Sequence, residues 1–263
     1  MTMRIALSIA GSDPTGGAGL QADLQVFRAL GVHGQGVVSA LTVQDTVKVH
    51  RVLPVFPNVV LDQLRTLLRD APPDAVKLGM LAGDEVVRAV AHGLGELPEG
   101  VPIVVDPVLA ASDGTPLLER RAIPALLELL SRCALVTPNL EEARELSGCD
   151  VSTRAGVEAA ARTLVEECGA GAALVKGGHA EGPPDDCLAL GQGGSTVVHW
   201  LTGRRLDVGP VHGTGCALAA AVTAGLAQGR SLEEAVDDAR RFVVEALARA
   251  EAAGSGARLL VFG

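Results

Sequence analysis

This 263-residue chain has few aromatic side chains and no excess of basic residues. Only 2% of the residues are aromatic, none is tyrosine, and 31 acidic residues outnumber 22 basic ones, for a formal net charge of −9. Non-specific binding to nucleic acid needs clustered Lys and Arg on the phosphates, and single-strand binding adds aromatic stacking platforms. The composition therefore argues against a nucleic-acid partner, although a local loop can still bind a small anion.

Cysteine pairs of the kind that mark disulfide frameworks or zinc sites are also absent. The five cysteines are an odd number, and no two of them form a CxxC pair. The N-terminal segment turns apolar at Ile5 but reaches Gly11, Ser12 and Asp13 too soon for a signal peptide or a membrane span. No GxxxxGK[ST] sequence occurs, so a P-loop nucleotide fold is not supported. We therefore expect a cytoplasmic protein with no membrane partner.

Short β-branched runs alternate along the chain with longer segments of helical period. Such alternation predicts parallel βαβ units with helices on both faces of a sheet. With 48% hydrophobic residues, we expect a large core and a single domain over residues 1–263. The predicted strands are residues 4–9, 37–43, 75–78, 101–105, 133–136 and 172–175, with a hairpin at 188–190 and 196–201. The predicted helices are residues 20–30, 60–68, 86–97, 119–130, 153–167, 214–228 and 232–252.

Small and polar residues recur directly after the predicted strands. In open α/β sheets, ligands bind just beyond the carboxyl ends of the strands, so residues in these positions should converge on one crevice. The sequence thus predicts an active site assembled from distant segments. In strand order, these residues are Ser12 with Asp13, Gln44, Gly79 with Met80, Asp106, Asn139 with Glu142, and Lys176.

Two glycine-rich segments each precede a predicted helix. Residues 212–216, His-Gly-Thr-Gly-Cys, would let backbone N–H groups at a helix N-terminus close around an anion. The alternative is a plain start of a helix. Residues 16–19 would either approach a ligand closely or form a turn that needs positive φ.

Asn139 and Glu142 stand three residues apart at a predicted strand-to-helix junction. One or two such oxygen ligands suffice for magnesium, which keeps several waters. The alternative is that Asn139 caps the helix and Glu142 completes a capping box. Lys176 either reaches a nucleotide phosphate or lies on the surface. Asp106 ends a strongly apolar predicted strand. Because an unpaired buried charge is costly, a purely structural role is harder to assign to this residue.

Seven ordered segments together resemble the hydroxymethylpyrimidine and phosphomethylpyrimidine kinases of thiamine synthesis, in the ribokinase-like superfamily. The resemblance implies an α/β fold with three α/β/α layers, a mostly parallel central sheet and a small β-hairpin. It also implies an ATP-dependent kinase that uses Mg²⁺ to phosphorylate 4-amino-5-hydroxymethyl-2-methylpyrimidine and then its monophosphate. A homodimer is the family expectation, and a monovalent-cation requirement stays open. The segments are residues 9–23, 41–46, 77–81, 105–108, 137–142, 176–179 and 212–216.

The same resemblance implies roles for individual residues. Gln44 would read the pyrimidine, because a side-chain amide can accept from an exocyclic amine while donating to the adjacent ring nitrogen. Cys216 stands where many ribokinase-like enzymes have an aspartate base, and since a helix N-terminus can lower a thiol pKa, a thiolate base is feasible. The other assignments are Gly213, Thr214 and Gly215 for the transferring phosphoryl; Gly11, Ala18, Asp23, Val43 and Met80 for the pyrimidine; Lys176 and Asn139 for ATP; and Asp106 and Glu142 for the metal.

Three segments depart from the family pattern. Residues 110–114 lack the basic residue usual in the loop after Asp106, residues 210–211 are Pro-Val instead of Asn-Thr, and residues 254–258 only partly match Gly-x-Gly-Pro. These changes concern nucleotide binding and closure more than pyrimidine recognition.

Two other functions compete with this interpretation. One is a pyridoxal or pyridoxine kinase on the same scaffold, against which Gln44 with Met80 favours the pyrimidine. The other is a non-catalytic ligand-binding regulator, which would not require the phosphoryl-transfer residues.

Overall fold

A nine-stranded sheet forms the centre of the computed structural model, which describes residues 3–178 and 182–262. Its strand order is β3-β2-β1-β4-β5-β6-β7-β8-β9. The strands from β2 to β7 in this order are parallel, while β3 at one edge and the β8–β9 hairpin at the other are antiparallel. The bounds are β1 (Ile5–Ser12), β2 (His33–Gln44), β3 (Val49–Pro54), β4 (Ala75–Leu78), β5 (Ile103–Val105), β6 (Leu135–Val136), β7 (Ala172–Val175), β8 (Asp186–Gln192) and β9 (Ser195–Leu201).

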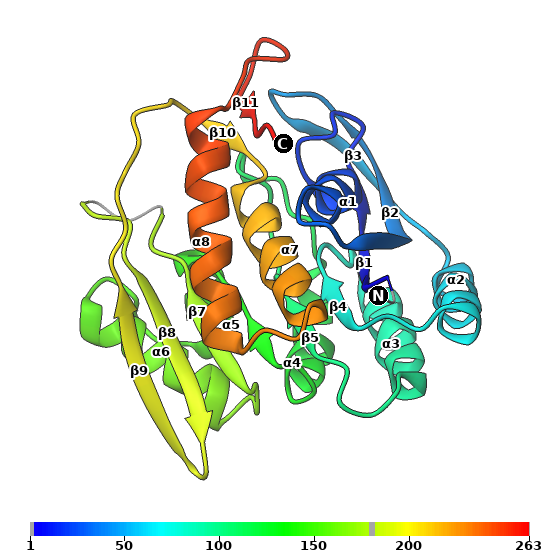
Figure 1. Ribbon diagram of the computed structural model, residues 1–263, viewed down its shortest axis with the longest axis horizontal. Helices are drawn as coiled ribbons and strands as arrows, with labels where there is room; N and C mark the ends of the chain where they lie inside the picture. Colours follow the sequence, from blue (N-terminus) through cyan, green and yellow to red (C-terminus); the bar gives the residue numbers. More distant parts are fainter. Residues whose placement is uncertain (1–2, 179–181, 263) are drawn as a thin grey trace.

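Helices cover both faces of the sheet, which confirms the predicted three layers and the hairpin (Figure 1). Alternation along β1 separates two cores, with Leu7 and Ile9 facing one helical layer and Ala6 facing the other. The layer over Ala6 holds α1 (Gly19–Ala29), α7 (Thr214–Ala227) and α8 (Leu232–Ala248). The opposite layer holds α2 (Pro57–Asp70), α3 (Asp84–Gly93), η1 (Leu94–Glu96), η2 (Arg120–Ala122), α4 (Ile123–Leu130), α5 (Leu140–Ser147) and α6 (Arg154–Glu166).

The alanine content of α7 explains its central place. A helix that is apolar on all sides is stable only when it is buried, and nearly all of α7 beyond its first turn is buried between the sheet, α1 and α8. Figure 1 shows α7 and α8 side by side. Gly225 permits this approach, since a Cβ there would lie 2.9 Å from the Cβ of Ala235. The first turn of α7 is thereby fixed at the carboxyl edge of the sheet.

Two features differ from the sequence-based expectation. β3 was not predicted, because His50 and Arg51 interrupt its apolar residues and it ends in proline, so it shows no strand alternation. A second, two-stranded sheet was also missed: β10 (Val211–His212) pairs in parallel with β11 (Arg258–Leu259). Strands of two residues leave no local pattern to detect. This sheet ties the C-terminal segment to the chain just before α7.

No helix in the described part of the chain is long and apolar enough to cross a membrane.

Candidate active site

Side chains that follow different strands meet at the carboxyl edge of the sheet, as predicted. Lys176, after β7, donates from Nζ to Oδ1 of Asp106, after β5, over 2.8 Å. Thr137, after β6, donates from Oγ1 to the same oxygen over 3.2 Å. The first turn of α7 closes this group, because a Cβ on Gly215 would lie 3.0 Å from Lys176 Nζ. His179, the last residue of the predicted lysine segment, lies outside the described residues.

The N-terminus of α7 is built to receive an anion. Gly213 caps the helix with φ of 80°, and a Cβ there would overlap the carbonyl oxygen of Gly17, so only glycine fits. Among the described residues, no backbone carbonyl accepts from the N–H groups of Thr214, Gly215 or Cys216. These N–H groups and the positive end of the helix dipole lie beside the Lys176 ammonium, which together suit a phosphate group.

Asp106 and Lys176 are both charged at neutral pH. Burial alone would raise the pKa of Asp106, but the ammonium groups of Lys176 and Lys77 outweigh it and the pKa is lowered. Burial opposes the charge on Lys176, but Asp106 and Glu142 raise its pKa. The edge of the sheet therefore carries a fixed cation and a fixed anion in contact.

Asn139 and Glu142 form the capping box that was the alternative to a metal site. Asn139 Oδ1 accepts from the Glu142 N–H over 2.9 Å, and Glu142 Oε2 accepts from the Asn139 N–H over 2.8 Å. Burial raises the pKa of Glu142 to about 7, opposed by Lys176 and reinforced by Asp106. The Glu142 carboxyl thus caps α5 and also lies within electrostatic reach of the Lys176–Asp106 pair.

The donor set fits a magnesium ion bound mainly through a ligand's phosphates. Within the described ranges, no three His, Cys, Asp or Glu side chains gather in a cluster that could hold a metal alone. Magnesium in phosphate sites usually takes only one or two carboxylates, with water and phosphate oxygens completing its shell. Asp106 and Glu142 can supply these oxygens.

Lys77 is the functional candidate that sequence reasoning passed over. Its Nζ donates to both carboxylate oxygens of Asp23 over 2.8 Å, and Ser8 Oγ donates to Asp23 Oδ2 over 2.6 Å. All three residues are fully buried between the sheet and α1. The signal was present in the sequence, because a lysine inside the apolar strand Ala75–Leu78 requires a buried partner.

This network corrects the expected role of Asp23. Its carboxylate was assigned to the pyrimidine, but both oxygens are engaged and no part of the residue is exposed. A buried ammonium without a counter-ion is costly, so Lys77 holds Asp23 beneath the site. Asp23 therefore supports the site from below and does not line it.

Cys216 lies in the first turn of α7 near this network, but its thiol is not activated. Burial raises its pKa to about 11; Lys77 opposes this shift, while Asp106 and Asp23 add to it. A helix N-terminus can lower a thiol pKa, which made a thiolate base feasible, but desolvation outweighs that effect here. The thiol is protonated at neutral pH in this state.

The expected pyrimidine-pocket residues only partly converge. Gly11 adjoins Met80, since a Cβ on Gly11 would lie 2.8 Å from Met80 Sδ. Ala18 precedes α1 and Gln44 ends β2. Val43 does not join these residues. It directly precedes Gln44 in β2, and because side chains alternate along a strand it points to the other face of the sheet, where 44% of its surface is exposed.

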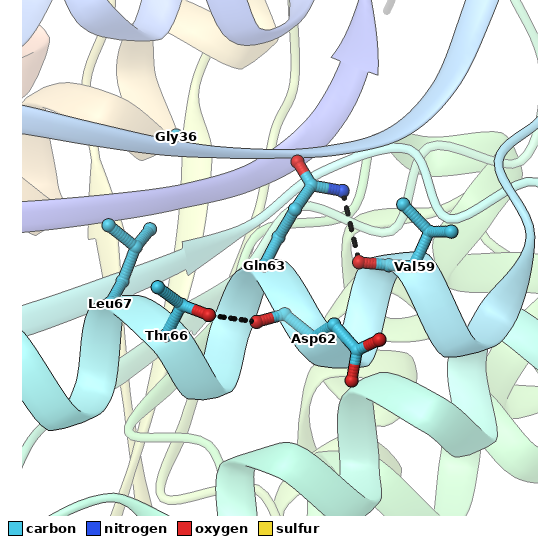
Figure 2. A pocket seen from close by; sticks show the side chains of 6 residues that line it. All are labelled: Gly36, Val59, Asp62, Gln63, Thr66 and Leu67. Carbon is cyan, nitrogen blue, oxygen red and sulfur yellow. Dashed lines mark hydrogen bonds between the residues drawn. The ribbon is translucent and has the colours of Figure 1, made fainter.

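A separate surface groove of about 420 Å³ lies between α2 and the first half of β2 (Figure 2). Two of its polar side chains are engaged within the protein: Gln63 Nε2 donates to the Val59 carbonyl and Thr66 Oγ1 to the Asp62 carbonyl. Gly36, which lines it, precedes Gln44 by eight residues of strand, roughly 26 Å. The groove is distinct from the residues at the strand ends.

Comparison with known sequences agrees with this geometry. A family model described as phosphomethylpyrimidine kinase matches residues 13–260. A hydroxymethylpyrimidine/phosphomethylpyrimidine kinase of Rhizobium meliloti is 42% identical over 248 residues, covering 94% of this chain and 91% of that protein. One from Staphylococcus aureus is 37% identical over 243 residues, covering 91% and 86%.

Solved structures share the fold over nearly the whole chain. Phosphomethylpyrimidine kinase from Clostridium difficile superposes with a TM-score of 0.81 at 32% identity, covering 93% of this chain and 99% of that one. Pyridoxal kinase from Staphylococcus aureus superposes with a TM-score of 0.89 at 32% identity, covering 100% and 94%. The expected ribokinase-like architecture is thereby confirmed.

We predict that Cys216 resists alkylation near neutral pH. With a pKa of about 11 instead of 9.0, its thiolate fraction at pH 8 is roughly a hundredfold lower, and its reactivity should fall accordingly. Iodoacetamide labelling followed by peptide mass spectrometry should show Cys216 reacting far more slowly than a small thiol of pKa 9, with a rate that rises about tenfold per pH unit. The variant Cys216→Ser identifies its peptide. Rapid labelling at pH 7 would contradict the burial argument.

Proposed function

The chain belongs to the phosphomethylpyrimidine kinase family, and we propose that it transfers the terminal phosphoryl group of ATP to 4-amino-5-hydroxymethyl-2-methylpyrimidine and then to its monophosphate. One observation supports this proposal: the first-turn N–H groups of α7, which bond to no backbone carbonyl in the described part of the chain, lie at the same edge of the sheet as the Lys176 ammonium and the Gln44 amide. A phosphate cradle and a base-reading amide are thereby combined.

Catalysis of phosphoryl transfer consists mainly of positioning the reacting groups and stabilising the charge on the transferring phosphoryl. In the proposed reaction, the N–H groups of Thr214, Gly215 and Cys216 bind the transferring phosphoryl, and Lys176 stabilises the charge that develops on its oxygens. Asp106 and Glu142 would hold a magnesium ion, which would neutralise charge on the nucleotide phosphates. Asn139 fixes Glu142 through the capping box.

Cys216 faces the same space but carries its proton in the free protein. A role as general base therefore requires that bound substrate lower its pKa. Without that change, the thiol positions the acceptor hydroxyl. The second acceptor, a phosphate monoester with a pKa of about 6, is already largely ionised at pH 7 and needs no strong base.

Phosphorylation of pyridoxal is a second candidate function. The similarity to a solved pyridoxal kinase at a TM-score of 0.89 favours it, and pyridoxal is also a small heteroaromatic alcohol. Gln44 supports the aminopyrimidine instead, because its amide can accept from the amino group and donate to the ring nitrogen.

The chain also suits a single-domain cytoplasmic enzyme that forms a homodimer. One sheet takes strands from residue 5 to residue 201, and all five cysteines are free thiols. Leu41 and Leu53 face each other across the β2–β3 pair, with 49% and 40% of their surfaces exposed. Val43, on the same face as Leu41, is 44% exposed. An exposed apolar stripe of this kind on an edge hairpin suits contact with a second copy.

We expect Gln44→Leu to weaken the reaction with the aminopyrimidine. Loss of both hydrogen bonds leaves polar groups of the substrate unpaired, at about 1–3 kcal/mol each, so kcat/KM should fall roughly 5- to 150-fold or more. Steady-state assays with the aminopyrimidine and with pyridoxal, at saturating ATP, measure this, and the KM for ATP is the control. An unchanged kcat/KM would remove Gln44 from its assigned role, and faster wild-type turnover of pyridoxal would favour the second function.

Glu142→Gln should raise the magnesium concentration for half-maximal activity, by roughly tenfold for a lost oxygen ligand. Glutamine can still accept the Asn139 N–H and keep the capping box, but it loses the 3.4 Å hydrogen bond from the Leu109 N–H, so the thermal stability should fall less than in Glu142→Ala. Glu142→Ala, which loses both functions, should also lower the melting temperature. If Glu142→Gln leaves the magnesium titration unchanged, Glu142 is a cap alone.

Leu53→Glu should convert a dimer to a monomer, because it places a carboxylate in the apolar stripe, where burial is costly. Sedimentation velocity at several protein concentrations measures this. Val197→Glu, at an exposed apolar position on β9, is the matched control. A wild-type protein that sediments as a monomer would overturn the dimer proposal.

A further inference from the structure

His212 has no role in the proposed reaction so far, yet it contacts the residue that reads the pyrimidine. Its Nε2 lies 2.9 Å from Gln44 Nε2 and 3.1 Å from Asp13 Oδ2. These residues are 168 and 199 positions away in the chain. Among the described residues, no other group hydrogen-bonds to the Gln44 amide, so its remaining positions are available to a ligand.

Asp13 is a fixed acceptor. Only 3% of it is exposed, and its oxygens also accept from the Thr15 N–H, the Thr15 hydroxyl and the Ala18 N–H, each over 2.9 Å. Burial would raise its pKa, but the hydrogen bonds from His212 and Thr15 outweigh this and lower it. A carboxylate can only accept hydrogen bonds, so His212 Nε2 must carry a hydrogen to bind it.

The imidazole is held in place. The backbone of His212 lies in β10 and pairs with Leu259 of β11. A Cβ on Gly17 would lie 3.0 Å from His212 Cδ2, so the ring fills the space beside the glycine loop. The single Nε2–H of His212 therefore lies within reach of both Asp13 Oδ2 and the Gln44 amide, and it can be shared between them as a three-centre hydrogen bond when Gln44 offers an acceptor.

This fixed donor determines which end of the Gln44 amide faces the ring. If Gln44 Nε2 faces the His212 N–H, two hydrogen-bond donors lie opposite each other. A half-turn of the Gln44 amide about its Cγ–Cδ bond brings Oε1 to the same point, where it accepts a hydrogen bond from His212. The side chain otherwise keeps its shape. In that orientation Oε1 retains one lone pair for the ligand, and both hydrogens of Nε2 are free to donate.

We propose that His212, held by Asp13, determines specificity by fixing the order in which Gln44 presents its acceptor and its donor. The inference rests on the proposed function and deepens it. A 4-aminopyrimidine carries a donor beside a ring acceptor and matches the fixed amide. A 4-oxopyrimidine of the same shape carries an acceptor beside a ring N–H, and matches only the reversed amide, which loses the His212 hydrogen bond. His212 is thus a positioning residue that acts through Gln44.

The test compares two acceptors that differ only at C4, 4-amino- and 4-oxo-5-hydroxymethyl-2-methylpyrimidine, with saturating magnesium and ATP. Wild-type protein should favour the amino compound in kcat/KM. In His212→Leu the amide is free to turn, so this preference should shrink roughly 10- to 100-fold, chiefly through faster use of the oxo compound. His212→Gln should restore much of the preference, because its amide nitrogen reaches the position of His212 Nε2, where one N–H can bind Asp13 while the second faces Gln44 Oε1.

The outcomes separate the inference from the function on which it rests. No wild-type turnover of the amino compound overturns the proposed function. If the amino compound is turned over and His212→Leu keeps the wild-type preference, the inference is wrong. An equal loss with both acceptors, not restored by His212→Gln, shows a purely structural role and also overturns it. Thermal unfolding of each variant confirms that folded proteins are compared.

Discussion

The buried ion pair of Lys77 and Asp23 is the interaction on which the active edge of the sheet depends. It joins β4 to α1, and the Ser8 hydroxyl of β1 completes it. Removing one partner of a buried pair leaves an uncompensated charge, at a cost of about 3–5 kcal/mol, so α1 can dock on the sheet in only one register. That register places the glycine loop before α1 against the first turn of α7, where the carbonyl of Gly17 leaves room only for glycine at position 213.

Two ion pairs at this edge are balanced internally, and the Asp13 carboxylate, whose pKa is lowered, adds negative charge. Lys77 balances Asp23, Lys176 balances Asp106, and Glu142, with a pKa of about 7, is only partly ionised at neutral pH. With a net charge of −9, the protein as a whole does not attract a nucleotide. Recognition of phosphate therefore depends on the oriented N–H groups of α7 and on ions that accompany the nucleotide, which are local and act at short range.

Sequence reasoning predicted those features that follow from the alternation of strands and helices. Asp106, Lys176 and the segment before α7 converge because parallel strands end at a common edge, and the capping box follows from the spacing of Asn139 and Glu142. It did not predict the features that depend on how deeply a side chain is buried or on pairing between segments far apart in the chain. The side of β2 on which Val43 lies, the burial of Asp23 and the raised pKa of Cys216 all depend on tertiary packing. The contact between Gln44 and His212 needs β10, whose partner strand lies 47 residues further along the chain.

The small β10–β11 sheet changes how two departures from the family pattern are understood. Two changes stand apart in the sequence: Pro-Val at residues 210–211 and the atypical segment 254–258. In the structure they are in contact, because the Arg258 N–H donates to the Pro210 carbonyl over 3.0 Å and Val211 pairs with Arg258. The Ala257 N–H also donates to the Thr46 carbonyl, just after Gln44. The two changes thus form one structural unit, so across homologues they should have been exchanged together and co-vary as a pair in evolution.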